Sequence, residues 1–380
     1  MNVSVVIRCL NEADTLAACL EKARAGLDAC DPDGEVIVAD NGSSDASREI
    51  AVAGGARLID VAERGYGSAL LAGIREARGQ WIIMGDADDS YDFREIPKFV
   101  AKLRDGAQLV QGCRLPSGGG TIMPGAMPFL HRWLGNPLLS TLVRWWFRAP
   151  IRDVYCGLRA FERDLVMGLS LRCTGMEFAT EMIIKATVTN ARIAEVPITL
   201  HPDGRVHGHR HLRTFRDGWR TLRLFLLYTP RWLFQIPGTL LMLLGIVGYA
   251  LALPRASIAG VRFDVHTLLV ASLAVICGFQ AIAFSVLART FASIEGLLPG
   301  PPIAFESGQL ERSMIVSLVS VIAGVALIAV AVNQWRLAGF GDLDYSRTMR
   351  WVIPGVMLTT LGVQLTLASF FLSLITLRRR

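Results

Sequence analysis

The chain has 380 residues, of which 52% are hydrophobic and only 19% are charged, and its formal net charge is +6. Together with a mean hydropathy of +0.40, this balance excludes an ordinary soluble enzyme of that size, so part of the chain is expected to lie in a membrane. The high apolar content excludes a disordered chain, and seven cysteines without paired spacings exclude a disulfide-stapled secreted module.

The first part of the chain has the character of a soluble α/β domain. Residues 1–232 contain 29 Lys and Arg and 27 Asp and Glu, whereas the remaining 148 residues contain 10 and 6. The first apolar run ends at Arg8, which indicates a buried strand and not a cleavable signal peptide. Runs rich in Val and Ile alternate with helix-like segments, which predicts a mostly parallel sheet with helices on both faces. Strands are predicted at 3–7, 35–39, 57–61, 80–85 and 108–111, and helices at 12–27, 45–54, 67–78 and 94–104.

Polar clusters follow three of the predicted strands, at the edge where such sheets bind ligands. They contain Asn11 and Glu12, then Asp40 to Asp45, then Asp86 to Asp89. The second cluster is also explained as a turn and helix cap. Two carboxylates one residue apart, Asp86 and Asp88, repel each other unless a cation lies between them. Because all donors are oxygen atoms, we expect Mg²⁺ or Mn²⁺ there.

The segment 130–148 is predicted to form an amphipathic helix. Leucine and tryptophan recur in it at helical spacing, and its arginines stay on the polar side. Tryptophan favours the boundary between lipid and water, so we expect this helix to lie in the head-group layer; a core helix of the soluble domain is the alternative.

Four apolar stretches are long enough to cross a bilayer, at about 233–253, 265–288, 314–333 and 352–377. Seven arginines against one acid between 205 and 231, and three arginines at the end of the chain, predict that both termini are cytoplasmic. The basic run also suits anionic lipid head groups or a phosphorylated lipid substrate. The chain is thus divided into a soluble domain (1–212), a basic juxtamembrane helix (213–232) and an all-α transmembrane domain (233–380).

Three motifs, in this order and spacing, resemble those of family 2 glycosyltransferases of the dolichol-phosphate mannosyltransferase type: 38–45 (Val-Ala-Asp-Asn-Gly-Ser-Ser-Asp), 64–70 (Arg-Gly-Tyr-Gly-Ser-Ala-Leu) and 85–88 (Gly-Asp-Ala-Asp). The segments 112–114, 153–159 and 195–198 are similar to the same family. The resemblance covers about residues 2–212 and implies a GT-A nucleotide-diphosphosugar transferase domain. The four spans resemble those of members that carry two pairs of transmembrane helices.

The resemblance also implies roles for individual residues. Asp40 would contact the nucleobase, Asp86 and Asp88 the metal and the diphosphate, and Arg114 and Arg132 the acceptor phosphate, so Asp88, Arg114 and Arg132 are the expected catalytic residues. The implied donor-binding residues are Asn11, Glu12, Asp40, Gly67, Asp86 and Asp88. The implied acceptor-binding residues are Arg114, Arg132, Asn136, Asp153, Arg159, Arg205 and His211.

The chain departs from the family pattern at several of these positions. Arg8 replaces the usual proline of the first strand, Asn136 replaces a serine, and Ser90 stands where a glutamine often helps to hold the metal. In the closing basic run, a Ser-Lys pair has become Arg210-His211.

The expected function is inverting transfer of one sugar from a UDP- or GDP-sugar to a membrane polyprenyl monophosphate. A processive polysaccharide synthase is an alternative. Such enzymes carry a Gln-x-x-Arg-Trp motif, and this chain has Arg231-Trp232 but no glutamine three residues before Arg231. A lipid-sugar flippase or scaffold with a regulatory domain is another. The histidines 201, 207, 209 and 211 are not expected to bind zinc, and neither Glu177 nor Glu181 is expected to act as an indispensable base. Nothing in the sequence calls for a nucleic-acid partner, and it leaves the oligomeric state undefined.

Overall fold

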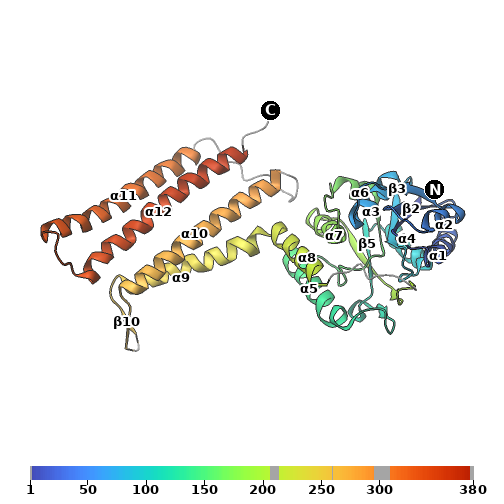
Figure 1. Cartoon of the computed structure of the whole chain (residues 1–380), viewed down its shortest axis with the longest axis horizontal. Helices are drawn as coiled ribbons and strands as arrows, with labels where there is room; N and C mark the ends of the chain where they lie inside the picture. The colour runs from blue at the N-terminus through green and yellow to red at the C-terminus, as the bar shows by residue number, and fades with distance from the viewer. Residues whose placement is uncertain (1, 206–213, 259, 295–308, 377–380) are drawn as a thin grey trace. The chain divides into compact units, whose positions relative to one another are not determined.

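The computed structural model describes residues 2–205, 214–258, 260–294 and 309–376. The chain divides into two compact units, Met1–Phe225 and Leu226–Arg380 (Figure 1). The first is an α/β unit, and the described residues of the second form helices and a small hairpin, β10 (Ser257–Ile258) and β11 (Val261–Arg262).

The α/β unit is built on a seven-stranded sheet in the order β3-β2-β1-β4-β7-β5-β8. Its strands are β1 (Val3–Cys9), β2 (Glu35–Asp40), β3 (Arg57–Asp60), β4 (Trp81–Asp86), β5 (Leu109–Cys113), β7 (Arg159–Glu162) and β8 (Ile193–Pro197). All neighbours are parallel except β7, which runs antiparallel to both β4 and β5. The predicted mostly parallel sheet is therefore confirmed. A second sheet pairs β6 (Thr121–Ile122) with β9 (Thr199–Leu200).

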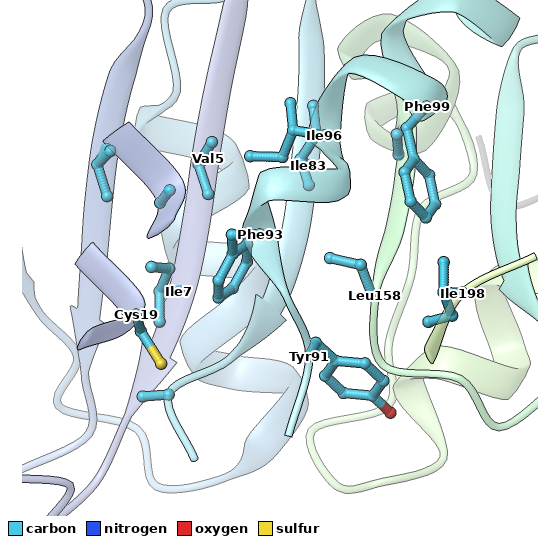
Figure 2. Packing of buried hydrophobic residues seen from close by; sticks show 14 of the residues in the cluster. Val5, Ile7, Cys19, Ile83, Tyr91, Phe93, Ile96, Phe99, Leu158 and Ile198 are labelled. Carbon is cyan, nitrogen blue, oxygen red and sulfur yellow. The ribbon is translucent and has the colours of Figure 1, made fainter. Parts of the chain in front are cut away.

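Helices cover both faces of the main sheet. The helices of this part of the chain are α1 (Leu16–Asp28), α2 (Ser47–Ala53), α3 (Tyr66–Glu76), α4 (Ile96–Arg104), α5 (Asn136–Phe147), α6 (Arg163–Gly168), α7 (Phe178–Val188) and α8 (Thr214–Tyr228). Val5 and Ile7 of β1 point into a core with Cys19 of α1 and Phe93, as Figure 2 shows. Val6 points to the other face, where a side chain at Gly73 of α3 would begin only 2.4 Å from it. This alternation fixes which side chains of β1 and β4 meet on each face.

Residues 131–147 are helical, as predicted, but the segment has two parts. A π-helical turn, His131–Gly135, leads into α5. Val143 is buried, and Trp146 and Phe147 pack edge-on against Phe225 of α8, with ring centroids 6.3 Å apart in both pairs. The opposite side stays open: Phe129, Leu130, Trp133, Leu134, Leu138 and Trp145 are exposed. One face of the segment is thus packed and the other presents apolar side chains.

The second unit contains four long helices, α9 (Ile236–Ala252), α10 (Val265–Ile294), α11 (Gln309–Leu337) and α12 (Tyr345–Thr376). Among the described residues, four helices are long and apolar enough to cross a membrane, at 231–252, 265–294, 310–337 and 345–376. Small residues let them pack closely: a Cβ at Gly245 would lie 2.8 Å from the carbonyl of Ala271, and one at Gly362 would lie 2.8 Å from that of Ser317.

Candidate active site

The candidate site lies along the carboxyl edge of three neighbouring parallel strands, β2, β1 and β4. The register pairs Cys9 with Asp40 and Arg8 with Asp86, so these residues reach the same edge. Glu12 lies three residues after the end of β1. The structure therefore brings together the polar clusters that follow three separate strands in the sequence, as expected for ligand sites in such sheets.

Two guanidinium groups from distant parts of the chain hold Asp86 and Asp88. Nε of Arg8 lies 3.3 Å from Oδ1 of Asp86, and Nη2 of Arg205 lies 3.0 Å from Oδ2 of Asp88. Asp88 also accepts hydrogen bonds from the backbone N–H and the hydroxyl of Ser90, at 3.1 and 2.6 Å. Ser90 therefore orients the second carboxylate of the pair.

Glu12 is a third carboxylate at this edge, and only 1% of it is exposed. Nε of Arg205 lies 2.8 Å from its Oε2, yet neither oxygen of Glu12 accepts a hydrogen bond from the described residues. Burial raises the pKa of Glu12 to about 7, and Arg205 and Arg8 oppose the shift. Burial also raises the pKa of Asp86, with Arg8 again opposing it. A further cation would stabilise the charged form of these buried carboxylates, because they accept few hydrogen bonds.

Arg205 lies at the carboxylates that are predicted to bind the donor. The resemblance implied that it serves the acceptor, but its contacts are with Glu12 and Asp88. The segment before it is tied down, because the backbone N–H of Gly204 donates to the carbonyl of Asp88 at 3.0 Å. The other predicted residue of this run, His211, lies outside the described residues.

Asp40 and Asn11 join two loops into one rim. Asp40 is 1% exposed and accepts hydrogen bonds from the backbone N–H of Ser43 at 3.1 Å and from Arg48 at 3.0 Å. Asn11 has a left-handed backbone, φ 56°, and its Oδ1 accepts from the N–H of Ser44 at 2.8 Å. The end of the site that is predicted to contact the nucleobase is therefore held together by hydrogen bonds of Asp40 and Asn11.

Gly67 packs against the protein itself. Its N–H donates to the carbonyl of Thr174 at 2.8 Å, and a Cβ there would lie 2.3 Å from the carbonyl of Cys173. The N–H is therefore already used, although the resemblance implied a donor-binding role. Glu181 holds the same segment by accepting from the N–H of Cys173 at 2.8 Å, and it pairs with Lys185 at 2.9 Å.

Arg114 and Asp153 form a buried ion pair beside the carboxylates. Nε and Nη2 of Arg114 lie 2.7 and 2.8 Å from the two oxygens of Asp153. Nη1 of Arg114 lies 3.5 Å from the hydroxyl of Tyr91, which accepts from the N–H of Gly157 at 2.9 Å. A Cβ at Gly157 would lie 2.7 Å from Oδ2 of Asp86. This network therefore reaches from the predicted acceptor arginine to the predicted metal ligand.

Arg159 lies among backbone carbonyl groups in the interior. It is fully buried, and its terminal nitrogens donate to the carbonyls of Ala179 at 2.6 Å and Cys156 at 2.8 Å. Burial lowers its pKa. These contacts hold the turn before β7 against α7, so they assign Arg159 to the support of the site and not to its surface.

Arg132 and Asn136 lie on the segment that ends in α5. The guanidinium of Arg132 is 5.5 Å from the ring centroid of Trp133, and Nδ2 of Asn136 is 3.4 Å from the sulfur of Met127. Within the described ranges, no hydrogen bond or ion pair joins either side chain to the carboxylate edge. Arg132 thus carries its charge on the apolar, exposed side of the unit.

Sequence reasoning did not assign Arg8 or Tyr91 to the site. Arg8 gives a signal, since a charged residue interrupts an otherwise apolar strand at its carboxyl end. Tyr91 gives none, because its place beside Arg114 depends on contacts between segments 23 residues apart. In the part of the chain that the structure describes, no three His, Cys, Asp or Glu side chains gather into a ready-made metal site.

The sheet and its carboxylate edge define an α/β domain of the GT-A type. Residues 4–166 match the glycosyl transferase family 2 profile, and residues 286–376 match that of the family 2 C-terminal transmembrane region. The chain is 35% identical over 373 residues to a low-salt glycan biosynthesis hexosyltransferase of Haloferax volcanii, covering 97% of this chain and 88% of that protein. It therefore belongs to glycosyltransferase family 2, and it is an enzyme that transfers sugars.

Two further relatives match the catalytic part. A dolichyl-phosphate hexose transferase of Haloferax volcanii is 31% identical over 198 residues, which covers 52% of this chain and 82% of that protein. An undecaprenyl-phosphate 4-deoxy-4-formamido-L-arabinose transferase of Salmonella paratyphi A is 30% identical over 203 residues, with coverage of 52% and 58%. The predicted resemblance to polyprenyl-phosphate glycosyltransferases with C-terminal membrane helices is confirmed.

Proposed function

We propose that this enzyme transfers one sugar from a nucleotide diphosphosugar to a membrane polyprenyl monophosphate, dolichyl or undecaprenyl, and forms a β-linked lipid-phosphate sugar. The observation that carries the proposal is the presence, in one chain, of a three-carboxylate sheet edge and four candidate membrane helices. The names of two relatives, a dolichyl-phosphate and an undecaprenyl-phosphate transferase, support a lipid phosphate as acceptor.

A divalent cation, Mg²⁺ or Mn²⁺, fits the donor end of the site. Asp86 and Asp88 would hold it, because both offer carboxylate oxygens at one edge, and the buried oxygens of Glu12 have no hydrogen-bond donor among the described residues. When bound, the metal would stabilise the charge of the departing nucleoside diphosphate. Arg205 now pairs with Asp88, so this side chain must shift when that carboxylate changes partner.

The acceptor needs positioning more than it needs a base. A phosphate monoester has its second pKa near 6, so it is already mostly a dianion at pH 7. Arg114 and Arg132 would hold it in line with the sugar carbon. Glu181 pairs with Lys185 and accepts from the N–H of Cys173, which supports the expectation that it is not an indispensable base. A single attack opposite the leaving group inverts the anomeric centre, so an α-linked donor gives a β-linked product.

The exposed apolar side of 129–145 suits contact with the bilayer surface. Phe129 is 79% exposed, and Trp133 and Trp145 are more than half exposed. Aromatic rings favour the interface between head groups and acyl chains. We infer that this surface lies in the membrane interface and brings Arg132 to the depth of a lipid phosphate.

A product assay tests the proposed function. The full-length protein in lipid nanodiscs is given undecaprenyl or dolichyl phosphate with a panel of UDP- and GDP-sugars, and the lipid is analysed by mass spectrometry and NMR. One sugar per lipid phosphate, β-linked, is expected. A polymer would identify a processive synthase instead. The absence of any sugar-lipid product with every donor would favour a flippase or a scaffold instead.

Replacing Arg132 by Ala should raise the KM for polyprenyl phosphate at least tenfold while the KM for the nucleotide sugar changes less than twofold. Charge-assisted contacts to phosphate are strong, and Arg132 makes no ion pair with the described residues that would have to be broken. Steady-state kinetics with each substrate varied in turn checks this, with the exposed Arg144→Ala on the same segment as control. Equal effects on both substrates would instead assign Arg132 to the donor.

Both termini are expected in the cytoplasm, because basic flanks remain on that side and four spans return the chain to it. A reporter that is active only in the cytosol, fused after Arg380, should be active, and the same reporter inserted between 339 and 341 should be silent. Activity at the second position and silence at the first would mean the opposite orientation or an odd number of spans.

A further inference from the structure

Arg8 occupies a central position at the carboxyl edge of the sheet. It is paired in register with Asp86 of the neighbouring strand, so both side chains project from the same face of the sheet. On that face, the guanidinium carbon of Arg8 lies 5.1 Å from the ring centroid of Tyr66, the first residue of α3. Asp86 on one side and an aromatic ring on the other fix where the guanidinium can lie.

The hydrogen-bonding capacity of Arg8 is largely unused. Its Nε is 3.3 Å from Oδ1 of Asp86, and among the residues that the structure describes no other hydrogen bond is made by this guanidinium. The side chain is 13% exposed, so the two terminal nitrogens retain limited access to solvent. A guanidinium has five N–H donors, and a nearly buried one normally satisfies them. On the same sheet, both terminal nitrogens of the fully buried Arg159 donate to backbone carbonyls.

Charge shows which ligand would complete this group. Glu12, Asp86 and Asp88 bring three carboxylates to the edge, and Arg8 and Arg205 bring two guanidinium groups. Arg205 is ion-paired with Glu12 through Nε, and its Nη2 donates to Asp88. Any diphosphate bound there adds negative charge, and both terminal nitrogens of Arg8 are without a partner among the described residues. The planar fork of a guanidinium matches two oxygens of one phosphate.

We propose that Arg8 is a donor-binding residue, whose terminal nitrogens bind a phosphate oxygen of the nucleoside diphosphate while Nε remains on Asp86. The inference rests on the proposed function for the identity of the donor. It deepens that function, because the resemblance implies a proline at this position, which has no charge to offer. Arg8 would thus share with the metal the neutralisation of the diphosphate.

A series of nucleotide affinities, measured without the lipid acceptor, tests the proposal. The affinities of the full-length protein for a nucleoside, its monophosphate and its diphosphate, in the uridine and guanosine series, are measured by calorimetry with Mg²⁺ and with EDTA. Arg8→Gln should weaken diphosphate binding by about 10- to 100-fold, the range for a charged hydrogen bond, while nucleoside binding changes less than twofold. With EDTA the wild type should still distinguish diphosphate from nucleoside, and Arg8→Gln should not.

Matched variants separate ligand binding from structure. Arg57→Gln removes another strand arginine, which pairs with Glu35 at a distance of 2.9 Å and lies away from the carboxyl edge. It should leave all the nucleotide affinities unchanged. Arg8→Lys keeps the charge but not the two parallel donors of the guanidinium, so its diphosphate affinity should lie between those of the wild type and Arg8→Gln. If Arg8→Gln does not fold, the diphosphate affinity of Arg8→Lys tests the proposal. Equal losses for nucleoside and diphosphate, or no loss, would overturn the role of Arg8. Failure of the wild type to bind either diphosphate would overturn the proposed donor itself.

Discussion

Asp88→Asn is expected to lower the transfer rate by about 100-fold or more, because removing a group that stabilises charge at the reacting centre commonly costs that much. The substitution keeps the size of the side chain and one oxygen for the hydrogen bonds from Ser90. It removes the negative charge that would hold a divalent cation, and it also loosens Arg205. Excess EDTA should reduce the wild-type rate in the same way, and added Mn²⁺ should restore it.

The neighbouring residue supplies a matched control. Asp89 has a left-handed backbone, φ 57°, which asparagine tolerates, and its carboxylate binds Lys22 at 2.6 Å instead of facing the edge. Asp89→Asn should therefore keep at least half of the wild-type rate. Initial rates at saturating substrates distinguish the two variants. Full activity of Asp88→Asn, or of the wild type in EDTA, would show that transfer needs no metal at Asp88.

Arg114→Ala should both destabilise the α/β unit and abolish turnover. It leaves the carboxylate of Asp153, which is wholly buried, without its ion pair, and breaking one half of a buried pair costs about 3–5 kcal/mol. Thermal unfolding should show a large fall in midpoint. By contrast, Arg94→Ala breaks an exposed pair with Asp92 and should cost less than about 1 kcal/mol.

A double variant separates the two roles of Arg114. Arg114→Met with Asp153→Asn removes both charges, so part of the lost stability should return. If Arg114 also binds the acceptor phosphate, the double variant should be folded and should bind the nucleotide like the wild type, but its KM for polyprenyl phosphate should stay high. If the nucleotide affinity and the KM for polyprenyl phosphate both return to their wild-type values, Arg114 acts only as the structural partner of Asp153.

The sequence by itself determined the parts of this protein that follow from local periodicity and composition. The strands from β1 to β5 were predicted within a few residues, because fully buried parallel strands appear as short runs of Val and Ile. The four long apolar helices were predicted because a helix that crosses lipid must remain apolar over a fixed length. The carboxylate edge followed in turn, since parallel strands bring their carboxyl ends to one side.

Only the tertiary structure decided which side chains meet at that edge. β7 enters antiparallel between β4 and β5, and its four residues carry no period that reveals this. Arg205 reaches Asp88 across 117 residues, and Arg8 reaches Asp86 across 78. Gly67 matched a motif, yet its neighbours use it for packing. Residues distant in sequence are paired by register and by crossover order, and these depend on how the whole sheet packs.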